Sequence, residues 1–130
     1  MNVIVTLRPN HIQLIKEGKK RIILRKNCPA RFNHQKDVIY ICEKGSKNVV
    51  GYTTIEQIIC THNKFGILTG WSKGIAISLE MIASYIKDAV ELYGFFIGGY
   101  KFFDKPLTLD DHFHVYKGPG TFVYTSDNYR

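Results

Sequence analysis

The feature that most constrains the fold is a long run of strand-forming residues, VVGYTTIEQII, at positions 49–59. β-Branched and aromatic side chains dominate this run, and both are enriched in strands. Its third residue is Gly51, and a glycine inside a strand commonly marks a bulge or a bend. We therefore expect one long strand that bends near Gly51, as strands do where a small β-barrel turns a corner.

Shorter strands surround this one. Alternating or continuous apolar runs predict them at residues 2–7, 21–25, 38–42, 95–103 and 121–124. Pro106 cannot donate to a ladder, so we expect the strand at 95–103 to end before it. Residues 27–36 and 60–77 have no clear hydrophobic period and are expected to be irregular.

Two helices are expected between these strands. Pro9 opens a short helix that Gly18 ends. Ser78 caps a second helix, over residues 79–88, whose apolar positions recur at helical spacing. Together the elements predict one α+β domain over residues 1–130. It is a small bent sheet or barrel of about five to seven mostly antiparallel strands with two or three short helices.

Positive charge gathers at the start of the chain. Residues 1–36 contain nine basic residues and one acid, and the whole chain carries a net charge of +7. Charge segregated in this way attracts a polyanion or an anionic ligand to one place. The densest segment is GKKRIILRK at 18–26, whose alternation places Ile22 and Leu24 on one face of a strand and Arg21 and Arg25 on the other. A solvated edge strand guarded by basic residues explains the same pattern.

Composition narrows the class of protein. Hydrophobic residues make up 45% of the chain, which is typical of a globular protein and not of a disordered one. No apolar run approaches the length of a membrane span, and no signal-peptide pattern opens the chain. The three cysteines match no zinc or redox spacing, so reduced thiols in a cytoplasmic protein are expected, with no cofactor and no membrane partner.

Enzymatic chemistry is a further hypothesis. Glu56 lies in the middle of the long strand and can pair with Lys20 or Arg25, and a buried Lys–Glu pair can supply a general base. A Glu56 side chain that points to solvent is the alternative. His112 and His114 alternate as they would on a strand, but no third ligand accompanies them, and no metal site is predicted.

Four segments, which span nearly the whole chain, resemble the ASCH domain of the PUA-like superfamily, a group of small β-barrels associated with RNA. They are GKKRIILR at 18–25, VIYI at 38–41 with VVGY at 49–52, residues 93–107, and residues 118–124. In that order they are similar to the family's G-x-K-x-x-E-x-R signature, its strand pair, its tyrosine-glycine helix exit with an f-x-x-P-i-x-L run, and its C-terminal strand. The resemblance implies a PUA-like barrel.

The resemblance also implies roles for single residues. Lys20 and Arg25 match family residues at the mouth of a cleft proposed to hold RNA or a nucleotide-like ligand. Ile23 stands where the family has an acid or, in members that resemble acetylcytidine amidohydrolases, a threonine nucleophile. Because isoleucine offers neither group, that chemistry lacks its nucleophile or its acid–base partner. Hydrolysis of RNA or of a modified nucleoside through Lys20 and Glu56 is kept as the alternative function.

The leading hypothesis is an RNA- or nucleotide-binding module, which needs cations for phosphates and aromatic faces for bases. The expected ligand-binding residues are Lys19, Lys20, Arg21, Arg25, Lys26, Tyr40, Tyr52 and Trp71. If they form one site, Lys20, Arg21 and Arg25 converge on one concavity, unless Ile23 closes it. A third hypothesis is a regulatory module that docks an acidic protein surface on the basic strand.

Overall fold

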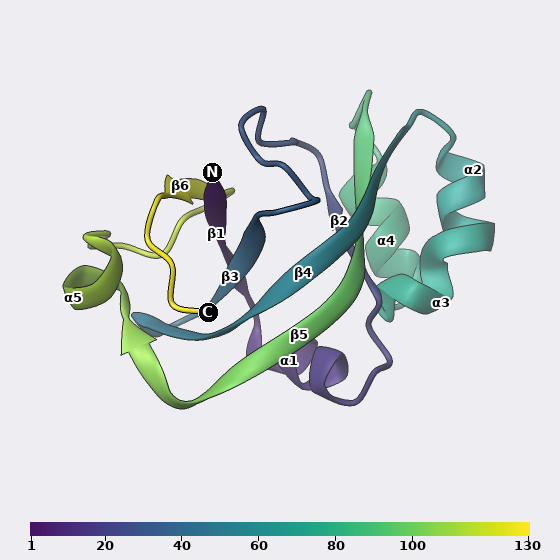
Figure 1. The fold of residues 1–130 in the computed structure, drawn as a ribbon. Helices are drawn as coiled ribbons and strands as arrows, with labels where there is room; N and C mark the ends of the chain where they lie inside the picture. Colours follow the sequence, from purple (N-terminus) through teal and green to yellow (C-terminus); the bar gives the residue numbers. More distant parts are fainter.

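Six strands form one mixed sheet in the computed structural model, which describes residues 1–130. The strands are β1 (Asn2–Leu7), β2 (Ile22–Arg25), β3 (Val38–Glu43), β4 (Asn48–Thr61), β5 (Leu92–Thr108) and β6 (Val123–Thr125). Their order is β2-β5-β4-β3-β1-β6, and only the β1–β3 pair is parallel. The sheet curls strongly, but β2 and β6 share no ladder, so it does not close into the expected barrel (Figure 1).

The bend predicted at Gly51 is confirmed. The register of β4 against β5 shifts between Val49 and Gly51. A Cβ atom on Gly51 would lie 2.3 Å from the backbone oxygen of Lys101, so only glycine permits this close approach of the two strands. The prediction for Pro106 was wrong, because β5 continues to Thr108. Pro106 lies in the stretch where the register skips from Phe102 to Leu107, so its missing N–H costs no ladder bond.

Two helices lie where they were expected, and a further helical segment beside the second of them was missed. The expected helices are α1 (Pro9–Lys16) and α4 (Leu79–Ile86), with the Ser78 hydroxyl accepting from Met81 N–H. Within 60–77, predicted to be irregular, the chain forms α2 (Lys64–Gly66), a π-helical turn η1 (Ile67–Trp71) and α3 (Ser72–Ile75). Glycines interrupt the apolar period of this segment, so its sequence did not predict a helix. Gly74 permits close packing of α3 on β2, since a Cβ atom would lie 2.9 Å from Ile22 Cδ1.

Two predictions near the C-terminus were also wrong in detail. Residues around His112 form a short helix, α5 (Leu109–Phe113), because Leu109 and Phe113 are four residues apart and both are buried. His114 follows in the left-handed region, with φ 57°, so the two histidines do not alternate along a strand. The last strand, β6, begins two residues later than the strand predicted at 121–124.

The core has three parts, and two of them hold β2. The inside of the curl packs Val3, Val5 and Ile39 against Ile23, while the outer face of β2 packs Ile22 and Leu24 against the helices (Figure 1). A separate cluster lies beneath α5. Because both faces of β2 are buried, this strand is not the solvated edge that basic residues alone suggested. None of the helices has the length and apolar content needed to span a bilayer.

Candidate ligand-binding site

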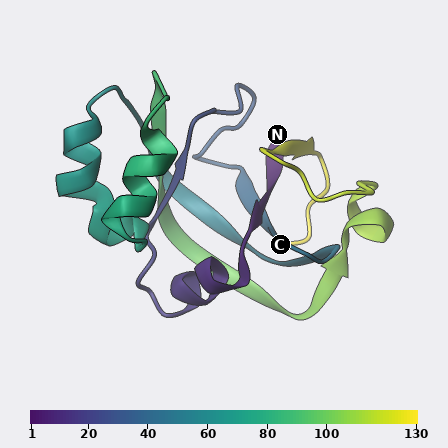
Figure 2. The same ribbon diagram turned by 180° about the vertical axis from the view of Figure 1, so that it is seen from behind.

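Three adjoining cavities lie along the seam where β2 and β1 face each other without pairing. We call them the inner cavity, of about 310 Å³, the groove, of about 770 Å³, and the recess, of about 90 Å³. Arg25 and Tyr85 line all three, which makes them one continuous feature. Figure 2 looks onto this side of the molecule, with β1, β2, α1 and α4 in front.

Each part of the site has its own character. The inner cavity is walled mainly by apolar side chains from inside the curl, namely Val3, Val5, Ile23, Ile39, Phe95 and Phe122. The groove is polar and takes residues from the start of α1, the β3–β4 turn, α4 and the 118–120 loop. The recess adjoins the groove, and the residues common to both are Leu7, His11, Ile77, Arg25 and Tyr85.

Every formally charged residue that lines these cavities is basic. They are Arg8, Lys20, Arg25, Lys26 and Lys44, joined by His11. The two ion pairs of the chain, Met1 N-terminus with Asp37 and Lys19 with Glu17, lie elsewhere. The cations of the site therefore have no carboxylate to balance them, and partly buried charges without a partner are costly to the fold.

Lys20 is the most deeply placed of these cations, at 4% exposed. The turn after α1 carries it inward, because Gly18 adopts φ 73° and the Lys20 N–H bonds to the Leu14 carbonyl. Its Nζ donates to the Ile75 carbonyl at 2.8 Å and has no other hydrogen-bond partner. Burial, and then the positive charge of Arg25, lowers the pKa of Lys20 from 10.5 to about 8. An ammonium has three donors, so two of them remain available to a ligand.

Arg25 and His11 complete the recess. Arg25 Nη2 donates across the seam to the Thr6 carbonyl at 3.3 Å. The Nε atom of Arg25 is buried and has no hydrogen-bond partner. His11 is half-buried, and burial together with Lys20, Arg8 and Arg25 lowers its pKa. The arrangement is thus a set of hydrogen-bond donors, several of them unused, around a small volume.

The predicted basic residues divide between this site and the surface. Lys20 and Arg25 line the recess, and Lys26 lines the inner cavity with its Nζ 4.5 Å from the Tyr85 ring centroid. Lys19 is exposed and pairs with Glu17 at 3.5 Å, and Arg21 is exposed and lines none of the three cavities. The expectation that Arg21 converges with Lys20 and Arg25 is wrong. The residues that follow Arg21 in the strand are packed on both faces, and this packing leaves the Arg21 side chain outside the cavities.

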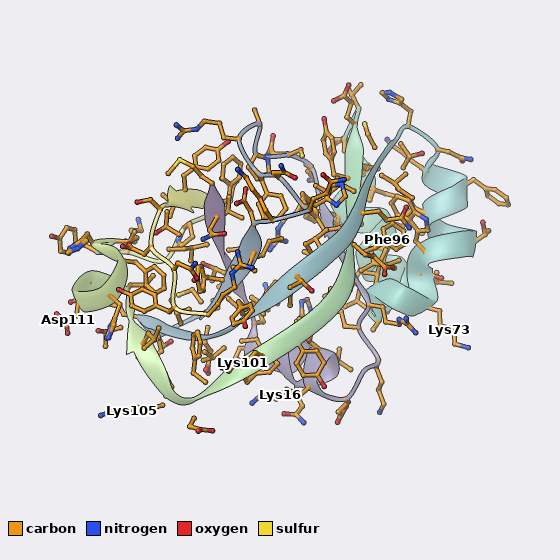
Figure 3. The ribbon with its side chains drawn as sticks, viewed as in Figure 1. Lys16, Lys73, Phe96, Lys101, Lys105 and Asp111 are labelled. Atoms are coloured by element: carbon orange, nitrogen blue, oxygen red, sulfur yellow. The ribbon has the colours of Figure 1, made fainter.

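The three aromatic residues proposed for stacking do not line the site. Tyr40 is fully buried, and its hydroxyl accepts from the Tyr129 N–H at 2.8 Å. Tyr52 packs edge-on against Tyr40, with 6.1 Å between the ring centroids. Trp71 packs at 5.4 Å against Phe96, which Figure 3 shows on the part of β5 next to the helices. Tyr40 is therefore part of the core, while Tyr52 and Trp71 are partly buried in packing contacts outside the three cavities.

Tyr85 is the aromatic residue common to all three cavities, and sequence reasoning missed it, as it missed Phe95 and Phe122 in the inner cavity. Tyr85 lies one position before the buried Ile86 and so on the border of the apolar face of α4, where an aromatic ring can be partly exposed. Arg8, His11 and Lys44 were missed as well, because only tertiary structure brings the start of α1 and the β3–β4 turn beside β2. The sequence did contain one signal for two of them, because the spacing of Arg8 and His11 places both on one helical turn.

Two residues of the enzymatic hypothesis can now be placed. Glu56 is exposed on β4 and forms no ion pair, so the Lys20–Glu56 pair lacks a geometric basis. Ile23 is 1% exposed and lines both the inner cavity and the recess. It is therefore part of the wall, and space remains beside it.

Comparison with known proteins identifies the fold. No protein-family model and no curated protein matches the chain. The solved ASCH protein from Zymomonas mobilis matches with a TM-score of 0.78 and 17% identity over 95% of this chain and 86% of that chain.

Two variants of the Zymomonas mobilis protein match equally well. A serine-to-alanine variant gives a TM-score of 0.81 at 16% identity over 95% of this chain and 87% of the other. A tyrosine-to-phenylalanine variant gives 0.78 at 16% identity, over 95% and 88%. The expected resemblance is confirmed at the level of the fold.

Proposed function

We propose that this chain, which has the fold of the ASCH domain, binds RNA or a nucleotide in a cleft made of the three seam cavities. The observation that carries the proposal is the charge of the lining: five basic side chains and a histidine, with no aspartate or glutamate. Phosphate groups supply the missing negative charge, and they dominate the affinity of proteins for nucleic acids.

The chemistry of the lining suits both halves of a nucleotide. Arg25 can bind a phosphate through paired N–H groups, and its guanidinium plane can also stack on a base. Tyr85 offers an aromatic ring between the groove and the inner cavity, and aromatic faces bind bases with little sequence preference. The groove, at about 770 Å³, is within the size range of ligand pockets.

The other two hypotheses receive less support. Hydrolysis through Lys20 and Glu56 requires a contact that an exposed, unpaired Glu56 does not make. Docking of an acidic protein on the basic strand would use only part of its charge, because Lys20 is buried and Arg25 reaches across the seam to Thr6, which leaves Lys19, Arg21 and Lys26 exposed.

The test is a titration of a short single-stranded RNA, followed by fluorescence anisotropy at two salt concentrations. The groove variant Arg8→Ala/Lys44→Ala removes two of its cations. The control variant Lys101→Ala/Lys105→Ala removes two exposed lysines of β5 that line none of the three cavities, and it has the same net charge as the groove variant (Figure 3).

We expect wild type and the control to bind RNA alike, with affinity that falls as salt rises. The groove variant is expected to bind at least about tenfold more weakly, because charge-assisted hydrogen bonds are lost. Equal losses in both variants would mean that net charge alone attracts RNA. An absence of binding at low salt, for RNA and for a mononucleotide, would refute the proposal.

A further inference from the structure

We propose that the recess receives a phosphate monoester, so that the cleft binds the phosphorylated end of an RNA strand or a mononucleotide and not the interior of a strand. This inference rests on the proposed function and specifies which part of the ligand reaches Lys20. It concerns the recess alone, and the groove retains its role for the rest of the ligand.

The shape of the recess favours a terminal group. Of its lining residues, the ones common to the groove lie on the open side. The others are Lys20, Ile23, Leu24 and Ile75, and all four are at most 6% exposed. Lys20, Leu24 and Ile75 line the recess alone, Ile23 also lines the inner cavity, and a volume of about 90 Å³ leaves no room for a strand to pass through. An internal phosphodiester needs chain on both sides, whereas a terminal phosphate needs it on one.

The size of the recess agrees with this reading. At about 90 Å³ it has room for a small group, whereas the groove that leads to it is many times larger. A phosphate with its ester bond pointing into the groove fills the recess and leaves a sugar and base in the wider space. Tyr85 lines both parts and stands beside that path.

The charge of the recess favours a dianion. Lys20, Arg25 and His11 line it together, and Arg8 stands beside His11 in the groove. A phosphate monoester carries a charge of about −1.5 to −2 near neutral pH, and an internal diester carries only one negative charge. The larger charge therefore offsets more of the unbalanced cations that surround this small volume.

The unused donors match the acceptors of a monoester. Lys20 Nζ has one partner, the Ile75 carbonyl, and Arg25 Nε is buried without any. A monoester presents three terminal oxygen atoms to such donors, whereas a diester presents two. Arg25 Nε is the kind of buried donor that a folded chain normally satisfies, and here a ligand oxygen can do so.

The test compares three versions of one short single-stranded RNA: with a 5′-phosphate, with a 3′-phosphate, and with hydroxyl groups at both ends. Dissociation constants are measured at one salt concentration for wild type, Lys20→Met and Lys19→Met. The Lys19 variant is the matched control, since it removes the neighbouring exposed charge outside the recess. His11→Gln serves as a second recess variant, and circular dichroism checks that each variant is folded.

We expect at least one end-phosphorylated RNA to bind wild type and Lys19→Met about tenfold or more tightly than the hydroxyl-ended RNA. Lys20→Met and His11→Gln are expected to lose most of this preference. Which end is preferred identifies the strand polarity in the groove, and inorganic phosphate should compete for the same site. Salt-sensitive binding of all three RNAs with equal affinity would overturn this inference and leave the proposed function intact. No binding of any RNA or of a mononucleotide would overturn both.

Discussion

Lys20 shows how a single side chain links the stability of this fold to its charge. Its Nζ is buried against the Ile75 carbonyl, and its pKa is lowered to about 8. In the unfolded chain the same lysine keeps an ordinary pKa near 10.5. The unfolded state therefore binds more protons between these two values, so the free energy of unfolding rises with pH across that window.

We predict that Lys20→Met stabilises the unliganded protein at pH 7. The full penalty for a charged buried lysine is present below pH 8 and disappears as pH rises toward 10.5. Lys20→Met removes this penalty but also loses one hydrogen bond, so we expect it to raise the free energy of unfolding by about 1 to 3 kcal/mol. Urea unfolding at pH 7 and at pH 9.5 measures this, and the advantage of the variant should shrink at the higher pH. A variant less stable than wild type at both pH values would contradict the account, and Lys19→Met should show no such pH-dependent gain.

At the scale of elements, the β4–β5 pair shapes the whole sheet. Its long strands bend where Gly51 meets the backbone of Lys101, and this bend curls the sheet toward β1. The opposing atoms belong to backbone and cannot rotate away as a side chain can.

We predict that Gly51→Ala destabilises the protein by more than about 2 kcal/mol, because overpacking against backbone forces the two strands apart. Gly70→Ala is the control. A Cβ atom at position 70 meets nothing within 4 Å, and alanine is the better helix former. Thermal unfolding followed by circular dichroism distinguishes the two variants. Similar melting temperatures for Gly51→Ala and wild type would show that the strand pair tolerates a wider spacing than we infer.

The elements also show what the sequence could and could not predict. Strands were found because burial leaves a direct mark on the sequence, such as the continuous apolar run at Val38–Cys42, where every residue is buried. The helices within 60–77 were missed because packing against β2, and not a regular apolar period, holds them there. In the site, Lys20 and Arg25 were identified from the resemblance. His11 and Tyr85 were missed, because they lie on separate helices. Their meeting depends on how the sheet curls, which no local pattern encodes.

At the scale of the whole molecule, the open seam gathers like charges. Cations from α1, β2 and the β3–β4 turn surround one continuous space, and no acid lines it. Bound anions should relieve the repulsion among these groups, so ligand binding and folding are coupled.

We predict that inorganic phosphate raises the melting temperature of wild type by several degrees. A ligand at a hundred times its dissociation constant adds about 2.7 kcal/mol to the free energy of unfolding. Sodium chloride at matched ionic strength should have a smaller effect, and Lys20→Met should respond less to phosphate than wild type does. Differential scanning fluorimetry provides the measurement. An equal response to chloride and phosphate would show that general screening, and not a site, accounts for the shift.

The pairing of β1 with β6 has a consequence for the order of events during synthesis. Asn2 pairs with Thr125, and residues 118–122 line the groove and the inner cavity. One edge of β1 pairs with β3, but its other edge stays unpaired until β6 is present, and such distant pairings slow folding. A ribosome must therefore translate residues 118–122 before the groove and the inner cavity are complete. The recess, lined only by residues 7–85, needs none of them, so its walls are synthesised well before the rest of the cleft.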